Sequence, residues 1–385
     1  MKFSILLPTR NRLELLLLAI ESVRSQDYGD WEVVVSDNAS EVDIAAAVSQ
    51  IGEPRILTHR FNQLVPVTDN WNAALEAATG DYFIMLGDDD VLLPGSLSTV
   101  RQLIDAWGSP DAIYAQAHQY AYPHVVPGHE SPFIQTGYNA FLAGRNTPFE
   151  LSRKEALSMV SAAMDFRILY GFNMQHFVFS RRLVENLGSK GRFFQSPYPD
   201  YYAANAVLLM AEKIVATPEA VCLIGISPKS FGYYYLNAME SDGVEFLHNV
   251  AAPEIVERLR GEVVPGTNMN DSWLCAMETL KRNFSELSPR VSYSRYRRLQ
   301  YHAVLSSSDP GRYLKVLRML RFWEIIVYGT IASVYALFRF VPGKYPRRVR
   351  EFISHALFSR SPRFDPNLHD VPYRDILEAA RAHGR

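Results

Sequence analysis

Four short apolar segments alternate with helix-like segments over the first 110 residues, and this alternation constrains the fold most strongly. The first two are predicted to be strands buried on both faces of a sheet, the first being continuous in apolar character, and the third is shorter. The four segments read KFSILLPT (2–9), WEVVVSD (31–37), RILTHR (55–60) and YFIML (82–86). Strands that alternate with helices of about 10–15 residues form parallel sheets with crossover connections. The sequence therefore predicts an α/β fold in which helices flank a mostly parallel central sheet.

Each predicted strand runs into a polar segment at its carboxyl end. PTRNR follows the first strand, SDNAS the second, HRFNQ the third and GDDD the fourth. Ligands of open α/β sheets bind beyond the carboxyl ends of the strands. We therefore expect a binding site at this edge of the sheet.

Three consecutive carboxylates, Asp88, Asp89 and Asp90, follow the fourth strand. Like charges this close repel one another and raise one another's pKa unless a cation lies among them. Carboxylates suit Mg²⁺ or Mn²⁺, which proteins often hold with one or two carboxylates plus substrate phosphates. The alternative is a solvated acidic turn in which Asp90 caps a helix. The neighbouring polar strand ends favour the metal site.

Three segments resemble, in order and spacing, the motifs of family 2 of the glycosyltransferases, whose nucleotide-sugar-binding fold is called GT-A. They are ILLPTRNR, VVVSDNAS and GDYFIMLGDDDVLLP, and the resemblance covers residues 1–110 well and 170–225 loosely. It implies a GT-A (Rossmann-like) fold with a helical C-terminal region. It also implies a metal-dependent, inverting transfer of a sugar from a nucleotide-diphosphate donor, most readily a UDP-sugar, to an acceptor hydroxyl.

Two positions depart from the family pattern. Ser36 precedes Asp37 where the family commonly has an aspartate pair, and Gly87 stands where the commonest DxD form has an aspartate. Which two of the three following aspartates contact metal and ribose therefore stays open. The resemblance favours Asp89 and Asp90 on the metal and Asp88 near the ribose.

The resemblance also assigns residues to the nucleotide. Pro8, Thr9 and Arg10 would lie against it, and Arg10 or Arg12 would reach a phosphate. A solvated position at a helix start is the alternative for Arg12. Asp37 would accept a hydrogen bond from the N3–H of uracil or thymine, or else close the strand in an Asx-turn.

Asparagines and one further aspartate complete the implied site. Asn62 and Asn72 lie in the segment that would border the nucleotide, although Asn70 and Asn72 are equally explained as residues of a first helical turn. The family's catalytic base is an acidic residue between an aromatic loop and a helix, and Asp200 has that place in GRFFQSPYPDYYAANAVL. Asp200 would deprotonate the acceptor hydroxyl; a helix N-cap is the alternative.

The pattern becomes mostly helical towards the C-terminus. We expect a catalytic domain over residues 1–235 and a mostly helical extension over 236–385. Residues 325–341 carry a single charge, Arg339, and basic residues flank them on both sides. A bilayer span needs about 20 apolar residues, so a buried helix, a membrane-surface helix and a short span all remain open. We expect peripheral membrane contact through 318–350.

Composition narrows the function further. The net charge of −2 argues against a nucleic-acid partner, and the two cysteines, Cys222 and Cys275, indicate neither a disulfide framework nor a metal site. The N-terminus is not a convincing signal peptide, so a cytoplasmic location at the inner face of the plasma membrane is expected. The family likeness suggests a saccharide or lipid-linked acceptor in bacterial cell-surface polysaccharide or glycolipid synthesis.

Two other functional classes compete with this interpretation. A non-catalytic nucleotide-sugar-binding scaffold with the same fold is the main alternative, but the intact acidic triplet and Asp200 weigh against it. A nucleotidyltransferase would be expected to carry a glycine-rich basic loop after the first strand, and PTRNR contains no glycine.

Overall fold

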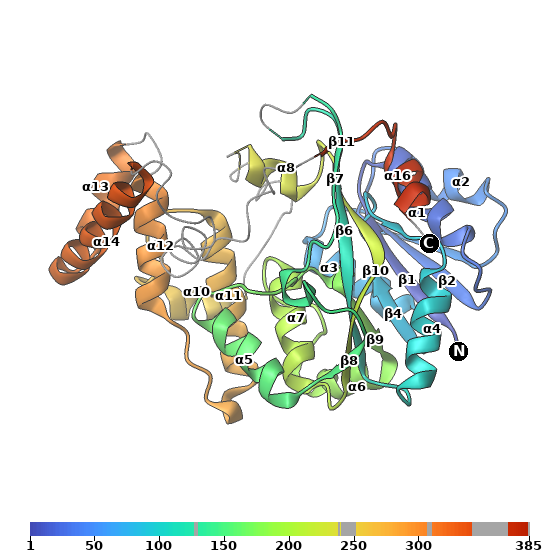
Figure 1. Ribbon diagram of the computed structural model, residues 1–385, viewed down its shortest axis with the longest axis horizontal. Helices are drawn as coiled ribbons and strands as arrows, with labels where there is room; N and C mark the ends of the chain where they lie inside the picture. The colour runs from blue at the N-terminus through green and yellow to red at the C-terminus, as the bar shows by residue number, and fades with distance from the viewer. Residues whose placement is uncertain (127–129, 238, 240–251, 306–309, 341–368, 384–385) are drawn as a thin grey trace. The chain divides into compact units, whose positions relative to one another are not determined.

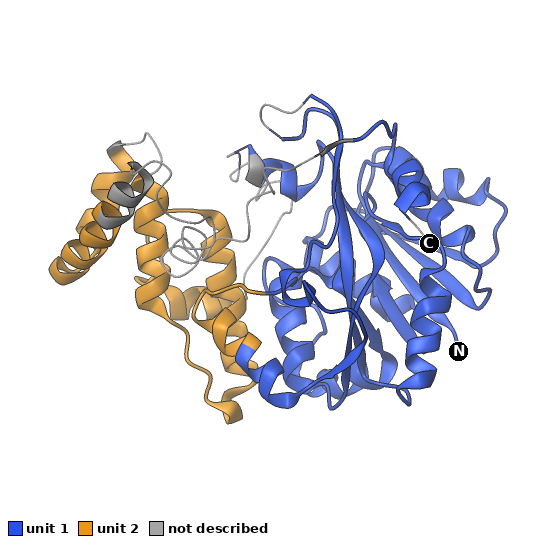
Figure 2. Cartoon of the chain, viewed as in Figure 1, with its two compact units in different colours: residues 1–158, 170–250, 364–385 blue, residues 159–169, 251–363 orange. Residues whose placement is uncertain are grey.

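The computed structural model describes residues 1–126, 130–237, 239, 252–305, 310–340 and 369–383 (Figure 1). The chain forms two compact units (Figure 2). Unit 1 contains Met1–Ser158, Tyr170–Val250 and Phe364–Arg385, and unit 2 contains Met159–Leu169 and Ala251–Arg363. The C-terminal residues therefore return to unit 1, which differs from the predicted division at residue 235.

Unit 1 is built on one mixed sheet. Its first half is parallel, in the order β4 (Tyr82–Met85), β1 (Phe3–Thr9), β2 (Trp31–Asp37), β3 (Ile56–Arg60). These are the four strands predicted from the alternation of strand-like and helix-like segments. Beyond β4 the sheet continues through antiparallel neighbours, namely β9 (Phe177–Ser180), β6 (Ala112–Ala121), β7 (Phe133–Gln135) and β11 (His369–Asp370). The half that carries the polar strand ends is thus wholly parallel.

Helices cover both faces of the parallel half. Side chains of β1 and β2 such as Ile5 and Val33 form one core with α1 (Leu13–Arg24), α2 (Ile44–Ser49) and α4 (Ser96–Ala106). Neighbouring positions on a strand point to opposite faces. Ser36 of β2 accordingly donates a hydrogen bond to Asn70 of α3 (Val67–Ala77) across the other face.

The remaining elements of unit 1 frame the second half of the sheet. They are β5 (Val91–Leu92), β8 (Phe149–Leu151), α6 (Arg181–Leu187), α7 (Pro199–Met210), α8 (Phe231–Leu236), α16 (Ile376–His383) and the short turns η1 (Ala140–Leu142), η2 (Met174–His176) and η3 (Gly188–Lys190). Helix α5 (Arg153–Met164) begins in unit 1 and ends in unit 2.

Strand β10 (Ile214–Ile226) corrects one expectation from the sequence. KIVATPEAVCLIGIS suggests two short strands, but the structure has one strand that pairs in parallel with β6. The register shifts between Thr217 and Cys222, where Pro218 and Glu219 interrupt the apolar pattern. A local bulge absorbs the interruption without ending the strand.

Unit 2 is helical, as the sequence predicts. Its elements after the end of α5 are α10 (Pro253–Leu259), α11 (Asn268–Asn283), η4 (Ser285–Leu287), α12 (Tyr293–Leu305), α13 (Pro310–Met319) and α14 (Phe322–Phe340). The indole N–H of Trp273 on α11 donates to the Ala163 carbonyl at 2.9 Å, which ties α11 to the end of α5. None of the helices in the described part of the chain has the length and apolar character needed to cross a membrane.

Candidate functional site

The strand ends of the parallel half meet as the sequence predicts. Thr9 at the end of β1 pairs with Asp37 at the end of β2, and the Asn38 N–H donates to the Thr9 carbonyl at 2.9 Å. On the other side of β1, the Leu86 N–H donates to the Leu6 carbonyl and leads β4 into the acidic turn. Three separate segments thereby converge at one edge of the sheet.

The acidic turn is buried, and a cation from the chain lies within it. Asp88, Asp89 and Asp90 are 3%, 7% and 2% exposed. Arg12 Nη1 donates to Asp88 Oδ1 at 2.7 Å and lies 3.6 Å from Asp89 Oδ1. Burial opposes the charge of Arg12, but the carboxylates outweigh it and raise the pKa of the guanidinium. Arg12 therefore offsets part of the repulsion among the three carboxylates.

Asp88 is tied to the end of β1. Its Oδ2 accepts a hydrogen bond of 2.7 Å from the Thr9 hydroxyl, while Oδ1 accepts the bond from Arg12. Both carboxylate oxygens are thus engaged by residues of the PTRNR segment. This arrangement holds the acidic turn against the segment expected to contact the nucleotide.

Asp90 anchors the turn to two other elements. Its Oδ2 accepts from the Gly87 N–H at 2.8 Å and from Gln175 Nε2 at 2.7 Å, and its Oδ1 accepts from the Gly225 N–H at 2.8 Å. Burial, with the neighbouring charge of Asp89, raises the pKa of Asp90 to about 8. These bonds engage Asp90 in holding the turn; the family resemblance favours it as a metal ligand.

Asp89 faces the loop that follows β10. Ser227 donates to Asp89 Oδ2 at 2.9 Å. Next to it, Arg12 donates to the Lys229 carbonyl, and Lys229 Nζ donates to the Asn11 carbonyl at 3.2 Å. Burial raises the pKa of Asp89. The loop GISPKS therefore contacts both the acidic turn and the PTRNR segment after β1.

Asp37 keeps one carboxylate oxygen without a hydrogen bond. The residue is fully buried, and its Oδ1 accepts from the Ser40 N–H at 3.0 Å. Its Oδ2 is buried, has no hydrogen-bond partner and lies 3.6 Å from Arg60 Nε. The Ser40 bond is the Asx-turn suggested by the sequence, so that turn and an acceptor role for the second oxygen coexist.

The other four residues predicted to border the nucleotide lie in four different environments. Pro8 is buried within β1, and Arg10 follows it with its Nε buried and without a hydrogen bond. Asn62 lies exposed just beyond β3. Asn72 is buried in α3, where its amide bonds both the N–H and the carbonyl of Phe194. Through those bonds Asn72 holds the loop before α7 against α3.

Asp200 lies in the first turn of α7, separate from the acidic turn. Tyr198 holds the N-cap position, so the alternative of Asp200 as a simple cap does not describe this helix. Asp200 Oδ1 instead accepts from the Met174 N–H at 2.7 Å. Burial raises the pKa of Asp200 to about 7. A carboxylate with such a pKa is suited to act as a general base near neutral pH.

The turn η2 joins the two acidic centres, a feature that the sequence gave no sign of. Its Met174 N–H binds Asp200, and the side chain of the next residue, Gln175, binds Asp90. The Gln175 carbonyl also accepts from the Cys222 thiol of β10 at 3.3 Å. No local pattern marks Gln175, because its partners lie 85 and 47 residues away.

The acidic turn fits a metal ion that arrives with phosphates. Across the described ranges, no three His, Cys, Asp or Glu side chains are grouped so as to hold a metal ion by themselves. Asp88 and Asp90 already use both oxygens, whereas Asp89 Oδ1 is beyond hydrogen-bond reach of Arg12. One carboxylate oxygen plus substrate phosphates is a common donor set for Mg²⁺.

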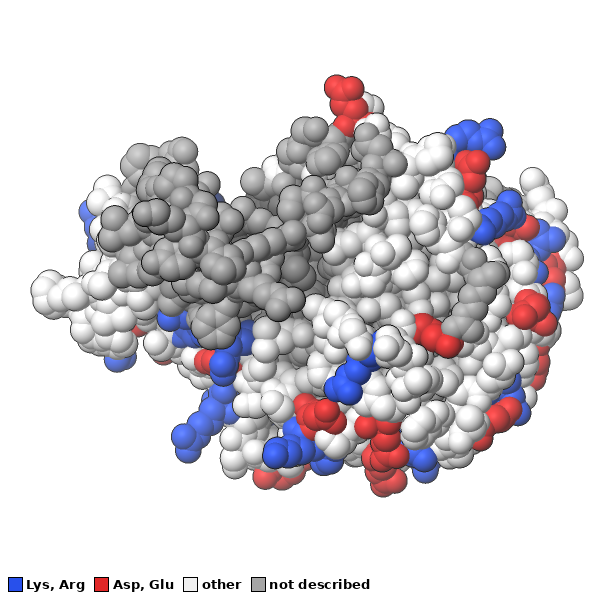
Figure 3. All heavy atoms as spheres, viewed as in Figure 1, with Lys and Arg blue, Asp and Glu red and all other residues white. Residues whose placement is uncertain are grey.

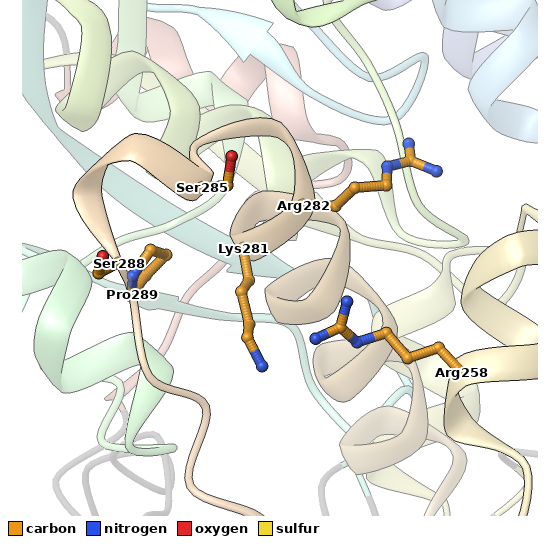
Figure 4. Close-up of a pocket in the computed structure, with 6 residues that line it drawn as sticks. All are labelled: Arg258, Lys281, Arg282, Ser285, Ser288 and Pro289. Atoms are coloured by element: carbon orange, nitrogen blue, oxygen red, sulfur yellow. The ribbon is translucent and has the colours of Figure 1, made fainter.

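A separate hollow lies in unit 2 (Figure 4). It has a volume of about 420 Å³ and is lined by Arg258, Lys281, Arg282, Ser285, Ser288 and Pro289. Arg258 and Lys281 pair with the buried Glu278, at 2.5 and 3.4 Å. These ion pairs account for two of the cations, and we assign the hollow no ligand.

Comparisons with known proteins agree with the motifs. Residues 4–156 match the family model described as Glycosyl transferase family 2. A Campylobacter jejuni protein named GalNAc(5)-diNAcBac-PP-undecaprenol beta-1,3-glucosyltransferase is 39% identical over 106 residues, which are 26% of this chain and 34% of that protein. A Mycobacterium bovis protein named PGL/p-HBAD biosynthesis glycosyltransferase is 33% identical over 117 residues, which are 29% of this chain and 45% of that protein. The chain thus spans less than half the length of these curated relatives.

A solved structure has a similar fold. It contains residues 1–349 of S. aureus TarS in complex with UDP-GlcNAc, with a TM-score of 0.51 and 15% identity. The match covers 93% of this chain and 84% of that chain. It confirms the predicted fold class, a sheet flanked by helices with a helical C-terminal region, as seen in GT-A glycosyltransferases.

Proposed function

We propose that this chain, which carries a glycosyltransferase family 2 domain over residues 4–156, transfers a sugar from a nucleotide-diphosphate donor to an acceptor hydroxyl. One observation carries the proposal: the buried acidic turn and the ends of β1 and β2 lie together at one edge of the sheet. The domain and its named relatives support a glycosyltransferase enzyme.

A uridine nucleotide is the proposed donor. Asp37 Oδ2 is a buried acceptor that has no hydrogen bond, although Arg60 Nε lies 3.6 Å away. It lies at the strand ends, where nucleotide ligands bind in such sheets. The N3–H of uracil or thymine would satisfy it. A buried carboxylate oxygen that lacks its hydrogen bond costs free energy, so this contact would favour a base with a donor at that position. UDP is our first choice and dTDP our second.

Arginines and Asp89 would act on the diphosphate. Arg12 is held beside the acidic turn, and Arg10 Nε is buried with its hydrogen-bonding capacity unused. Both are suited to bind phosphate oxygens and to stabilise the charge that develops on the leaving diphosphate. Asp89 would hold Mg²⁺ or Mn²⁺, which would supply further neutralisation of that charge.

Asp200 is the proposed general base. In its ionised form it would remove the proton from the acceptor hydroxyl, and the oxygen would attack the anomeric carbon as the bond to the diphosphate breaks. The nucleoside diphosphate leaves with the electron pair of that bond. One displacement inverts the anomeric configuration and needs no covalent enzyme intermediate.

The acceptor is proposed to be a saccharide or a lipid-linked saccharide. The Campylobacter jejuni relative is named for a substrate linked to PP-undecaprenol, and the Mycobacterium bovis relative for PGL/p-HBAD biosynthesis. By analogy we place this chain in bacterial cell-surface polysaccharide or glycolipid synthesis, in the cytoplasm at the inner face of the membrane.

A transfer assay tests this proposal. Wild-type protein with Mn²⁺, lipid-linked saccharide extracts and a panel of UDP-sugars should release UDP with one donor, and the product should have the inverted anomeric configuration. Asp200→Asn should release UDP about 10²- to 10⁴-fold more slowly, while Asp69→Asn, which changes an exposed carboxylate of α3, should match the wild type. Binding of UDP-sugars without release of UDP from any combination would instead support a scaffold.

A further inference from the structure

Unit 2 exposes a group of large apolar side chains on two consecutive helices. Phe322 and Trp323 at the start of α14 are 79% and 48% exposed. The exposed group, which we call the α13–α14 face, also contains Leu314, Met319, Ile326 and Val327. Only two residues separate the helices, and both pack against α12 (Figure 1). Monomeric soluble proteins rarely expose apolar side chains in such groups without a partner.

The opposite side of the same helices is a formed core. Val316 and Leu320, from α13 and the residue after it, meet Tyr328 of α14 and Tyr301 of α12 in one buried cluster. Tyr328 donates to the Ser294 carbonyl at 2.9 Å, which fixes α14 on α12. The helix pair is therefore folded with its core side satisfied. Its exposed apolar residues are not needed for that core.

Within residues 310–333 the exposed charges have one sign. Exposed basic residues of 310–333 are Arg312, Lys315, Arg318 and Arg321, and the one acidic residue of this stretch is Glu324. Glu324 is buried and accepts two hydrogen bonds from Arg297 of α12, at 3.0 and 3.1 Å. No exposed carboxylate from this stretch therefore offsets the cations. Figure 3 shows white, uncharged atoms at the left tip of the view, where Figure 1 has α14.

We propose that the α13–α14 face docks onto the surface of an anionic lipid bilayer. Apolar side chains beside basic ones are typical of helices that lie in the membrane interface, where the rings enter the acyl boundary and the cations meet anionic headgroups. A second copy of this chain fits less well, because two such faces would bring their cations together.

Vesicle flotation with the full-length protein tests the docking. Wild type should float with phosphatidylcholine vesicles that contain 30% phosphatidylglycerol, and about tenfold less with pure phosphatidylcholine. The double variants Phe322→Ser/Trp323→Ser and Arg318→Glu/Arg321→Glu should each lower partitioning into anionic vesicles at least tenfold. Two matched pairs at exposed positions elsewhere, Val42→Ser/Leu57→Ser and Lys154→Glu/Arg290→Glu, should leave it within twofold.

The outcomes separate this proposal from its rivals. Equal flotation with both vesicle types, or flotation unchanged in both face variants, would overturn it. So would failure to float combined with a dimer, seen by light scattering, that the Phe322→Ser/Trp323→Ser variant disrupts. The assay contains no nucleotide or sugar, so its result does not depend on the proposed transfer. UDP binding by the face variants, measured separately, would show that unit 1 is intact.

Discussion

Arg12 provides, from within the chain, a cation for three adjacent carboxylates. It bonds Asp88 directly and lies close to Asp89, while Asp90 depends on two backbone N–H groups and Gln175. Removing the cation from a buried carboxylate strongly destabilises the folded protein, because nothing then offsets the cost of desolvating the charge. The acidic turn can therefore be formed before any ligand arrives.

Arg12→Ala should lower the free energy of unfolding by about 3 kcal/mol, since it leaves Asp88 buried beside like charges. Arg24→Ala, at the other end of α1, removes an exposed ion pair with Glu21 and should cost less than about 1 kcal/mol. Urea denaturation of the two variants measures both effects. Similar losses for the two would show that Arg12 contributes no more than a surface charge.

Asp200 should impose a pH dependence on catalysis. Burial raises its pKa to about 7, and a base works only when ionised, so kcat/KM should rise with pH and level off above that value. Asp200→Asn should lower kcat by about 10²- to 10⁴-fold and leave UDP affinity unchanged. The measurement is a pH series of initial rates for both proteins. A rate that falls as pH rises through 7 would exclude Asp200 as the base.

At the scale of single residues, the sequence predicted those that belong to short motifs. Thr9, Asp37 and Asp89 were predicted because each belongs to a strand-end motif that resembles the family pattern, and the structure places these motifs at one edge of the sheet. Gln175 and Gly225 were not, because they reach Asp90 only through the folding of segments 85 and 135 residues away. Asn72 was given a place beside the nucleotide, but its buried amide bonds the backbone of Phe194.

Among the elements, β10 supports the acidic turn by close backbone contact. A Cβ placed on Gly225 would lie 1.9 Å from the Asp89 carbonyl oxygen and 3.1 Å from Ile376 Cδ1. The Gly225 N–H also donates to Asp90. Only glycine allows the strand and the turn to approach this closely.

Gly225→Ala should therefore displace the acidic turn. We expect a loss of about 3 kcal/mol in the free energy of unfolding and at least tenfold weaker UDP binding. Gly29→Ala is the matched control, since a Cβ there has no neighbour within 4 Å. Denaturation and calorimetry would measure the two effects. Wild-type behaviour of Gly225→Ala would show that the strand and the turn are free to move apart.

A helix or strand could be predicted from the sequence where the pattern that marks it lies within its own residues. Strands β1 to β4 were predicted because short strand-like segments alternate regularly with helix-like segments along the chain. Strand β10 was predicted as two pieces because Pro218 and Glu219 interrupt its pattern, and its pairing with β6 overrides that interruption. Helix α16 was not anticipated in unit 1, because its apolar residues give no indication of which distant core they join.

Over the whole molecule, the C-terminal segment completes unit 1. Helix α16 buries Ile376, Ala379 and Ala380 in a cluster with Val91 and Leu223. Those partners belong to the strand that follows the acidic turn and to β10. The candidate site therefore combines residues near the N-terminus, such as Thr9, with support from a helix near the C-terminus.

Ile376→Ala should lower the free energy of unfolding of unit 1 by about 2–5 kcal/mol, through lost burial and the cavity left behind. Val42→Ala, at a position that is 45% exposed, should change it by less than about 0.5 kcal/mol. Hydrogen exchange of the β1 and β4 amides reports on unit 1 alone. Unchanged protection in Ile376→Ala would mean that unit 1 folds without this segment.

Calorimetric titration with UDP, with and without Mn²⁺, tests the central claim most directly. Wild type should bind more tightly with Mn²⁺, and Asp89→Ala should lose that metal dependence. Asp37→Asn should bind at least tenfold more weakly, because its amide offers a donor where the base needs an acceptor. Asp105→Asn, which alters an exposed carboxylate of α4, should match wild type. Absence of binding by the wild type to UDP, dTDP and GDP alike would contradict the assignment of a nucleotide-sugar site.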